Sequence, residues 1–484
     1  MRLTFPLLLL CTSIVVGTEI PIPPRVAASP FRHIVVIVQE NRTPDNLFQG
    51  LCAPPYGSPD ACSASGGDSK YDIQTNAWLD ERSPTGTTEP TAIPLANGYD
   101  LDHSNAAFTA MCDADPFTGF CLMDGAGAVT CLGNCVKHPQ FRYVENTAGR
   151  VTPYLELATQ YGWANYMFQT NRGPSFPAHQ FLFGGTSAPS AADDSIGVFA
   201  SENVSPGGPA GIAGCFAPAD TTVQLIGPDG YELPGAKVYP CFEHETLPDV
   251  LPGSVTWRYY TPSSGSIWTA PNAIQHICES SGPGGECQGK EWARNVDLKP
   301  ADILRDIGSC NLRSVSWVVP SGANSDHPRV TDGRGPAWVA AIVNAIGMSS
   351  KCDSGRGYWR DTAILITWDD WGGWYDHEPP PTLDYPQGGY QYGFRVPLLV
   401  VSAYTPRHTI NNAKHDFGSI LRFIESNFGV EEGALHFADA RANNDLLGFF
   451  DFQLKARPYT AIAAPTTAEF FLNDPRPPSD PDDQ

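Results

Sequence analysis

Uninterrupted apolar runs of strand length recur along the chain. They cover residues 33–39, 255–260, 314–319, 362–368 and 396–402. Runs without polar alternation are typical of strands buried on both faces, as in parallel sheets. Apolar residues at helical spacing predict helices over 152–163, 338–346 and 416–428. Together these elements predict an α/β fold in which a central, mostly parallel sheet is flanked by helices.

The stretches between these elements predict the domain organisation. Residues 30–470 are expected to form a single domain, because no repeat or linker divides them. The irregular segments near 50–150 and 185–250 carry most of the cysteines, and we interpret them as disulfide-bearing loop insertions that wall a site. The Pro- and Asp-rich residues 474–484 are predicted to be a disordered tail.

The first residues indicate export. Arg2 precedes an apolar run that is too short and interrupted for a transmembrane helix. Residues 1–17 therefore predict a signal peptide, and the mature protein is expected to be secreted, outside the cell or into the periplasm, without stable membrane insertion. Acidic residues outnumber basic ones by 52 to 30, which gives a net charge of −22. Such a charge repels nucleic acid, so nucleic acid is not an expected partner.

The cysteine count agrees with export. Of 13 cysteines, Cys11 leaves with the signal peptide, and 13 − 1 = 12 is an even number that suits disulfides in an oxidising compartment. Proximity in the sequence suggests the pairs Cys52–Cys62 and Cys278–Cys287. The alternative is a zinc site, whose spacing fits no common finger pattern, at Cys121, Cys131 and Cys135.

Hard oxygen ligands follow two of the predicted strands. Glu40 and Asn41 come directly after the run 33–39, and Asp369 and Asp370 come directly after 362–368. Because the carboxyl ends of parallel strands meet at one edge of a sheet, these distant residues are expected to form one site. An all-oxygen ligand set suits one divalent ion of the Ca²⁺, Mg²⁺ or Mn²⁺ class.

Further motifs follow in a fixed order. They are HIVVIVQENRTPDNLF at 33–48, DHSNAAF at 102–108, NRGPSFPAHQFLFGGTS at 171–187, NSDHP at 324–328 and WDDWGGWYDH at 368–377. The series resembles the bacterial phosphoesterase family that contains non-specific phospholipases C and acid phosphatases. That resemblance implies an alkaline-phosphatase-like α/β sandwich and a secreted, metal-dependent phosphoesterase.

The resemblance also implies roles for individual residues. Ser175 occupies the position of a nucleophile that forms a phospho-enzyme, and it joins Glu40, Asn41, Asp369 and Asp370 around the metal. A serine at a helix N-terminus meets free N–H groups that favour an anion.

Four more residues are candidates for contacts with the substrate. His103 and His327 match the family's histidine segments and are expected to be catalytic, together with His377, which alternatively supports Asp376. Imidazole side chains bind phosphate and donate protons near neutral pH. Arg42 and His179 are expected to bind the substrate, or to brace the ligand loop and orient Ser175.

The resemblance does not determine which class of phosphate ester the protein hydrolyses. Ser175 with the Asp369–Asp370 pair favours an acid phosphatase that hydrolyses small phosphate monoesters. The alternative is a phospholipase C that cleaves the head groups of phosphatidylcholine-like lipids. A sulfatase is disfavoured because His179 stands where its motif has arginine. A catalytically dead binding protein is a third interpretation, against which the retention of the matched positions argues.

Overall fold

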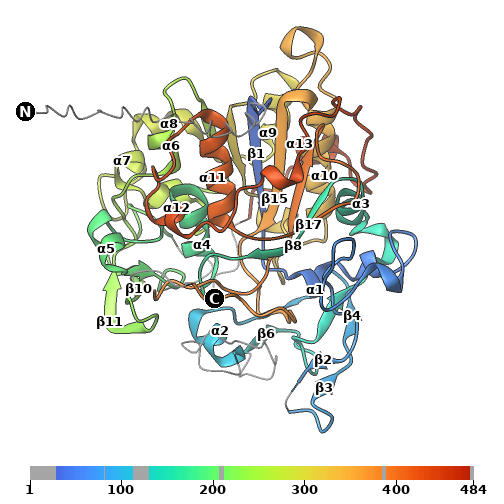
Figure 1. Cartoon of the computed structure of the whole chain (residues 1–484). Coiled ribbons are helices and arrows are strands. Elements are labelled where there is room, and N and C mark those ends of the chain that lie inside the picture. The colour runs from blue at the N-terminus through green and yellow to red at the C-terminus, as the bar shows by residue number, and fades with distance from the viewer. Residues whose placement is uncertain (1–28, 81, 113–129, 207–211, 384–387, 480–484) are drawn as a thin grey trace, which may run out of the picture.

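The computed structural model describes residues 29–80, 82–112, 130–206, 212–383 and 388–479. Its centre is an eight-stranded sheet (Figure 1) with the order β13 (Val296–Asp297), β12 (Trp257–Tyr260), β14 (Val315–Val318), β1 (His33–Gln39), β15 (Thr362–Trp368), β16 (Leu398–Ser402), β8 (Gly162–Phe168) and β17 (Thr409–Asp416). Neighbouring strands are parallel except where β16 pairs antiparallel with β15 and β8. The prediction of an α/β fold with a mostly parallel sheet is confirmed.

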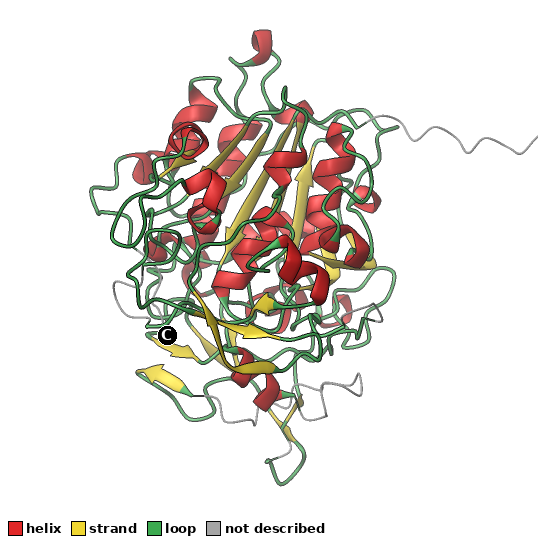
Figure 2. Ribbon diagram, turned by 90° about the vertical axis from the view of Figure 1, so that its left-hand side faces the viewer, coloured by secondary structure: helices red, strands yellow, loops and turns green. Residues whose placement is uncertain are grey.

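Helices cover both faces of this sheet, as Figure 2 shows from the side. One layer contains α3 (Thr152–Gln160), α9 (Asp302–Gly308), α10 (Gly335–Gly347) and α13 (Ala468–Leu472). The other layer contains α4 (Ser175–Gly184), α6 (Leu247–Val250), α11 (Phe417–Phe428) and α12 (Phe437–Arg441). Because both faces are covered, the strand residues of β15 are buried throughout, which explains their continuous apolar sequence.

Short elements fill the segments that were expected to be insertions. The segment before α3 contains α1 (Pro44–Leu47), β2 (Trp78–Leu79), β3 (Thr87–Thr88), β4 (Thr91–Ile93), β5 (Tyr99–Leu101), α2 (Asn105–Met111), β6 (Cys131–Gly133) and β7 (Arg142–Val144). The segment 185–250 contains α5 (Ala191–Ile196), β9 (Phe199–Ala200), β10 (Val223–Ile226) and β11 (Glu232–Val238), while α7 (Gln275–Cys278) and α8 (Lys290–Asn295) lie beyond it. Figure 1 shows α1, α2 and β6 beyond the lower end of the central sheet, the end at which β1 leads into α1.

The element predictions were accurate where the pattern was strong. The runs 33–39 and 362–368 are β1 and β15 without a change of boundary, and Asp416 caps α11 by accepting from Ser419 N. The helix predicted over 152–163 ends at Gln160, because Gly162 already begins β8. Strands β8 and β17 were not predicted, since both carry polar residues that break the apolar run.

Disulfide bonds cross-link the loop-rich segments. They join Cys52 to Cys62, Cys131 to Cys135, Cys215 to Cys241, Cys278 to Cys287 and Cys310 to Cys352. Cys112 is disulfide-bonded as well. Both proximity pairs are thus present, and the Cys131–Cys135 bond overturns the alternative zinc site, of which Cys121 lies outside the described residues.

The chain ends differ from the expectation in part. The predicted signal peptide, residues 1–17, lies outside the described residues. In the predicted tail, Ser479 accepts from Gly322 N and Ala323 N, and Arg476 pairs with Asp332. Residues 474–479 therefore make specific contacts that a disordered tail would lack, while 480–484 lie outside the described part. Within the described residues, none of the helices has the length and apolar character that a membrane span requires.

Candidate active site

The carboxyl edge of the central sheet gathers the polar residues that follow its strands. Gln39 lies opposite Trp368 in the parallel register of β1 and β15, so Glu40 and Asp369 leave the sheet side by side. β8 points the same way as β15, because both are antiparallel to β16. The chain after β8 leads to Ser175, the first residue of α4. Segments that are far apart in sequence thus meet at the edge where α/β sheets place ligands.

Ser175 faces a cluster of buried carboxylates. Its Oγ lies 3.5 Å from Glu40 Oε2 and 3.3 Å from Asp370 Oδ2. Glu40, Asp369 and Asp370 are each 0% exposed. Burial raises the pKa of Glu40 and of Asp370, and the Asp369 carboxylate raises both further. The cluster therefore favours any group that neutralises negative charge.

Main-chain contacts lock the two ligand-bearing segments together. Asn41 N donates to Asp369 Oδ1 at 3.1 Å, and Arg42 N donates to Asp370 O at 3.1 Å. Asn41 itself has a φ of 61°, in the left-handed region. A Cβ atom on Gly372, whose φ is 63°, would lie 2.5 Å from Asn41 O. Only glycine permits this approach, so the Gly-Gly segment of the sequence motif serves the geometry of the site.

The oxygen atoms of the cluster fit a hard divalent cation. Asp369 Oδ2 and Asn41 Oδ1 are buried without a hydrogen-bond partner among the described residues. One ligand atom each from Glu40, His179 and Asp369 lies within 4.8 Å of the other two. Unpaired buried oxygen atoms are costly, whereas carboxylate and amide oxygens are the ligands of the Ca²⁺ and Mg²⁺ class. The buried cluster is therefore suited to a cation of that class.

His103 and His327 both have a fixed ring orientation. His103 Nδ1 lies 2.7 Å from Leu101 O, and His327 Nδ1 lies 2.8 Å from Pro328 O. Because a carbonyl oxygen only accepts, each Nδ1 carries a proton and each Nε2 is left for other partners. The two rings are neighbours, with centroids 6.2 Å apart. The polar contacts that fix the His327 ring involve Nδ1, and the side chain is 2% exposed.

His103 reaches the carboxylate cluster directly. Its Nε2 lies 3.0 Å from Asn41 Nδ2 and 3.9 Å from Asp370 Oδ2. Burial lowers the pKa of His103, but Asp370 and Asp100 outweigh it and raise that pKa to about 9. The contact with the Asn41 amide needs a neutral ring, whereas the raised pKa favours a cation. A divalent ion among the carboxylates would remove this conflict, because it would cancel the charges that raise the pKa.

His179 belongs to the ligand cluster by position. It lies four residues after Ser175, with Nε2 3.2 Å from Glu40 Oε1 and 3.8 Å from Asp369 Oδ2. Burial lowers the pKa of His179 to about 4, although Asp369 opposes this, so the ring is neutral at pH 7. Its expected role in substrate binding stays a prediction. These contacts suit a residue that orients Glu40 or ligates the cation.

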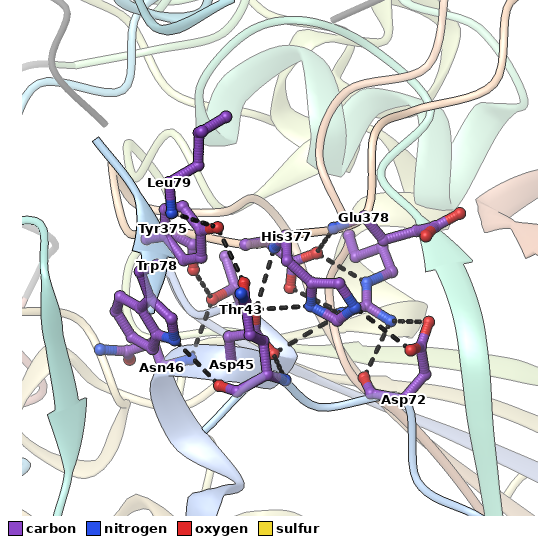
Figure 3. A network of polar contacts seen from close by, with 12 residues as sticks. Thr43, Asp45, Asn46, Asp72, Trp78, Leu79, Tyr375, His377 and Glu378 are labelled. Carbon is purple, nitrogen blue, oxygen red and sulfur yellow. Dashed lines mark hydrogen bonds and ion pairs between the residues drawn. The ribbon is translucent and has the colours of Figure 1, made fainter. Parts of the chain in front are cut away.

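His377 lies in a different polar network, drawn in Figure 3. Its Nδ1 is 2.7 Å from Asp45 Oδ2 and its Nε2 is 3.2 Å from Asp72 Oδ1. Burial opposes protonation, but Asp45 and Asp72 raise the pKa of His377 to about 10. Arg395 binds Asp376 with two hydrogen bonds, at 2.7 and 3.1 Å. The structure does not bring His377 to Ser175, and its catalytic role stays a prediction that these contacts do not favour.

Arg42 braces the site from behind. It is 0% exposed, and its Nε and Nη2 donate to Asp326 O at 3.1 and 2.8 Å. Its guanidinium also lies 5.0 Å from the ring centre of Trp374. Of the two roles considered for Arg42, these contacts agree with bracing the ligand loop; substrate binding stays a prediction.

A cavity of about 520 Å³ lies beside the start of α4. His103 and Pro174, the residue before Ser175, are among its lining residues. Asp102, Glu202, Glu232 and Lys237 line it as well, so acidic groups outnumber lysine and arginine there. The cavity is large enough for a phosphate group together with one of its substituents.

Sequence reasoning did not single out two buried acids near the histidines. Asp100 Oδ2 lies 4.0 Å from His327 Nδ1, and Asp326 directly precedes His327. Both acids are 0% exposed. Asp326 stands inside the NSDHP motif, and Asp100 lies two residues before DHSNAAF, so proximity to a motif was the available signal.

The fold and the clustered side chains define an α/β protein with a candidate hydrolytic site at the carboxyl edge of its sheet. Comparison with protein families names the group: the chain belongs to the phosphoesterase family, whose model matches residues 31–431.

Similar curated proteins carry phospholipase C names. The hemolytic phospholipase C of Pseudomonas aeruginosa is 22% identical over 471 residues, which cover 87% of this chain and 56% of that protein. Phospholipase C B of Mycobacterium tuberculosis is 29% identical over 179 residues, 33% of each protein. The chain thus spans about half of the first relative's length and a third of the second's.

Among solved structures, a Vibrio parahaemolyticus protein described as a member of the alkaline phosphatase superfamily matches at 13% identity. The match covers 57% of this chain and 60% of that one, with a TM-score of 0.29. At so low a score, the description of the fold rests on the sheet itself.

Proposed function

We propose that this protein hydrolyses phosphodiesters of the phospholipid head-group class, as a phospholipase C does, through a phospho-enzyme at Ser175. The observation that carries the proposal is the Ser175 hydroxyl, which lies 3.3–3.5 Å from two buried carboxylates beside an open cavity. The names of the relatives support a phosphodiester substrate over the monoester favoured by the Ser175 and Asp369–Asp370 pattern.

The chain's own groups are suited to the proton transfers. In the first step Ser175 Oγ forms a bond to phosphorus as the bond to the leaving oxygen breaks. The serine proton passes to Glu40 or Asp370, and the leaving oxygen takes a proton from His327 Nε2. In the second step water attacks phosphorus and gives a proton to His327 Nε2. The bond to Ser175 breaks, and the carboxyl group returns its proton to Oγ.

Positive charge is needed where the phosphoryl oxygens sit. Glu40, Asn41, Asp369 and Asp370 would hold a divalent cation, which when bound neutralises phosphoryl charge and lowers the pKa of the serine hydroxyl. The N-terminus of α4 adds its partial positive charge at Ser175. His103 lines the cavity and holds the Asn41 amide, which keeps that ligand turned to the cluster.

Hydrolysis of phosphate monoesters by an acid phosphatase is the second candidate. Burial lowers the pKa of His327, so the imidazolium that donates to the leaving oxygen is populated on the acid side of neutral. This feature favours activity at acidic pH for either ester, whereas the Ser175 and Asp369–Asp370 pattern is the reason to retain the monoester alternative.

A substrate comparison tests the proposal. We expect the purified protein to cleave phosphatidylcholine vesicles and p-nitrophenylphosphorylcholine faster than p-nitrophenyl phosphate at equal concentration. Ser175→Ala should fold with an unchanged Tm and lose activity by about 10⁴-fold or more, because a methyl group has no nucleophilic oxygen. Faster cleavage of the monoester would favour the acid phosphatase. Full activity in a folded Ser175→Ala protein would remove the phospho-enzyme mechanism for both.

A further inference from the structure

Asp326 contacts both strand ends that carry the cation ligands, through its main-chain N and O at β1 and through its buried carboxyl group at β15. Its N donates to Gln39 Oε1 at 3.0 Å, and its O accepts from Arg42. Gln39 and Arg42 flank the ligand pair Glu40–Asn41 in the sequence. Its Oδ2 accepts from Trp368 Nε1 at 3.0 Å, one residue before Asp369.

We propose that Asp326 is a positioning residue, which fixes the His327 turn against the strand ends that carry the cation ligands. This inference rests on the proposed function, because it assumes that His327 transfers protons in the reaction and must therefore be held in position. Asp326 itself contacts no reacting group; it acts through its neighbour.

The side chain of Asp326 is fixed by several specific contacts, although it takes no part in the reaction. Both Tyr154 Oη, at 2.8 Å, and Trp368 Nε1 donate to the same oxygen, Oδ2. Oδ1 has no hydrogen-bond partner among the described residues. A Cβ atom on Gly335 would lie 2.1 Å from Oδ1, so α10 begins with a glycine where the carboxyl group needs space. A buried carboxylate kept in this way, with one oxygen unpaired, is more readily explained by geometry at the site than by stability.

The His327 turn needs such an anchor because the hydrogen bonds of His327 itself are all local. His327 N donates to Ser325 Oγ at 3.1 Å, Nδ1 contacts Pro328 O, and His327 O accepts from Thr331 N at 3.0 Å. These bonds shape the turn without tying it to the sheet. Strands β1 and β15, by contrast, are fixed to each other by a continuous parallel register. Asp326 is therefore the residue that holds His327 in a fixed position relative to the rigid strand ends that carry the ligands.

The test separates geometry from charge. Asp326→Ala removes the acceptor and should lower kcat by about 10²-fold, the size expected when a reacting group moves by about 1 Å. Asp326→Asn should restore most of the activity, because its amide oxygen can replace Oδ2 as the acceptor of both hydrogen bonds. Cation affinity, measured by calorimetry with Ca²⁺, Mg²⁺ or Mn²⁺, should stay unchanged in both variants. Equal losses in the two variants, or a cation affinity that falls with kcat, would overturn the proposal.

A double-mutant cycle and a burst assay show whether the effect passes through His327. In a His327→Ala background, Asp326→Ala should cost little more, since both changes remove one function. With p-nitrophenylphosphorylcholine, whose leaving group needs no proton, Asp326→Ala should keep a rapid burst of p-nitrophenol and slow the steady state. Losses that multiply in the double mutant, or a burst that disappears, would refute the assignment.

Two controls keep the outcomes distinct. If Asp326→Ala does not fold, Tyr154→Phe removes one of the same hydrogen bonds and should show the same pattern at smaller size; an unchanged steady state there would count against the proposal. Asp80→Ala removes a buried carboxylate from the β2–β3 hairpin, which accepts from Thr88 and Arg82 N, and should lower Tm without changing the ratio of burst to steady state. Retention of activity in Ser175→Ala would defeat the proposed function, whereas additive losses at Asp326 and His327 defeat only this inference.

Discussion

Asp369→Asn is expected to stabilise the cation-free protein while it weakens the cation complex. The variant keeps the Oδ1 acceptor that binds Asn41 N and Asp370 N. It replaces the unpartnered Oδ2 by an NH₂ group that can donate to a neighbouring carboxylate. One buried negative charge disappears from beside Glu40. Burial and Asp369 both raise the pKa of Glu40, which is the signature of repulsion that the variant relieves.

The geometry sets the magnitude. Ligand atoms of Glu40 and Asp369 lie within 4.8 Å of each other. At that separation and an effective dielectric constant of about 20, two unit charges repel by about 3.5 kcal/mol. Because the pKa of Glu40 is raised in the wild type, about 3.5 kcal/mol is an upper limit for the gain. For 484 residues, an unfolding entropy of about 2 cal/mol/K per residue converts this limit to a Tm increase of at most about 3–4 °C.

Thermal unfolding with and without cations is the assay. In EDTA at pH 8, Asp369→Asn should melt above the wild type. A saturating divalent ion should raise the wild-type stability by about 2.7 kcal/mol at a hundredfold excess over Kd, and raise that of the variant less. In the absence of a cation, the wild-type protein should be more stable at acidic pH, because the pKa of the Glu40 carboxyl group is higher in the folded than in the unfolded state. The contribution of Glu40 to the free energy of unfolding is largest below the unfolded pKa of about 4.3 and falls as pH rises towards the folded pKa.

The matched control is Asp326→Asn, an equally buried carboxyl group that faces Tyr154 and Trp368 and has no contact with Glu40. Its Tm change should be the same in EDTA and in the cation buffer. If Asp369→Asn behaves like this control, with one Tm change in both buffers, the carboxylate cluster is not a cation site and the reasoning fails.

Two further predictions concern backbone and pH. Gly372→Ala should lower cation affinity and kcat by at least tenfold, because its Cβ would lie 2.5 Å from Asn41 O. The control is Gly429→Ala, at a residue with a similar φ of 75° and open space around it. This variant should lose about 1–2 kcal/mol of stability with kcat unchanged. His276→Gln should lower Tm at pH 6 and have little effect at pH 10. Asp249, 3.3 Å from Nε2, raises the pKa of His276 to about 9, and the stabilisation by this ion pair is lost as pH rises through that value. An equal Tm change at both pH values, or equal activity loss in both glycine variants, would contradict these expectations.

The sequence predicted the part of the site that depends on sheet geometry. Continuous apolar runs identified β1 and β15, and their shared register places Glu40 beside Asp369. The sequence did not predict β8, whose Gly162, Asn165 and Tyr166 interrupt the apolar pattern. The path by which Ser175 reaches the same edge was therefore supplied by the structure.

Histidine roles were harder to predict because spacing along the chain does not determine which polar group a ring meets. His377 lies in the same motif only seven residues after Asp370, yet it faces Asp45 and Asp72. His179 is one helical turn from Ser175, and its contacts are with ligand carboxylates. A motif identifies such histidines, while the conformation of the loops between motifs determines which polar groups their rings contact.

Several departures from ordinary folding rules occur together at this edge of the sheet. Asn41 adopts a left-handed φ, carboxylates are buried beside one another, and Asn41 Oδ1 and Asp369 Oδ2 lack partners among the described residues. Each feature costs free energy, and a helical or apolar alternative at these positions would avoid that cost. A single cation would offset the repulsion and engage both free oxygens, whereas a purely structural role explains neither. These costs support the proposal that this edge of the sheet binds a cation and, through it, a phosphate ester.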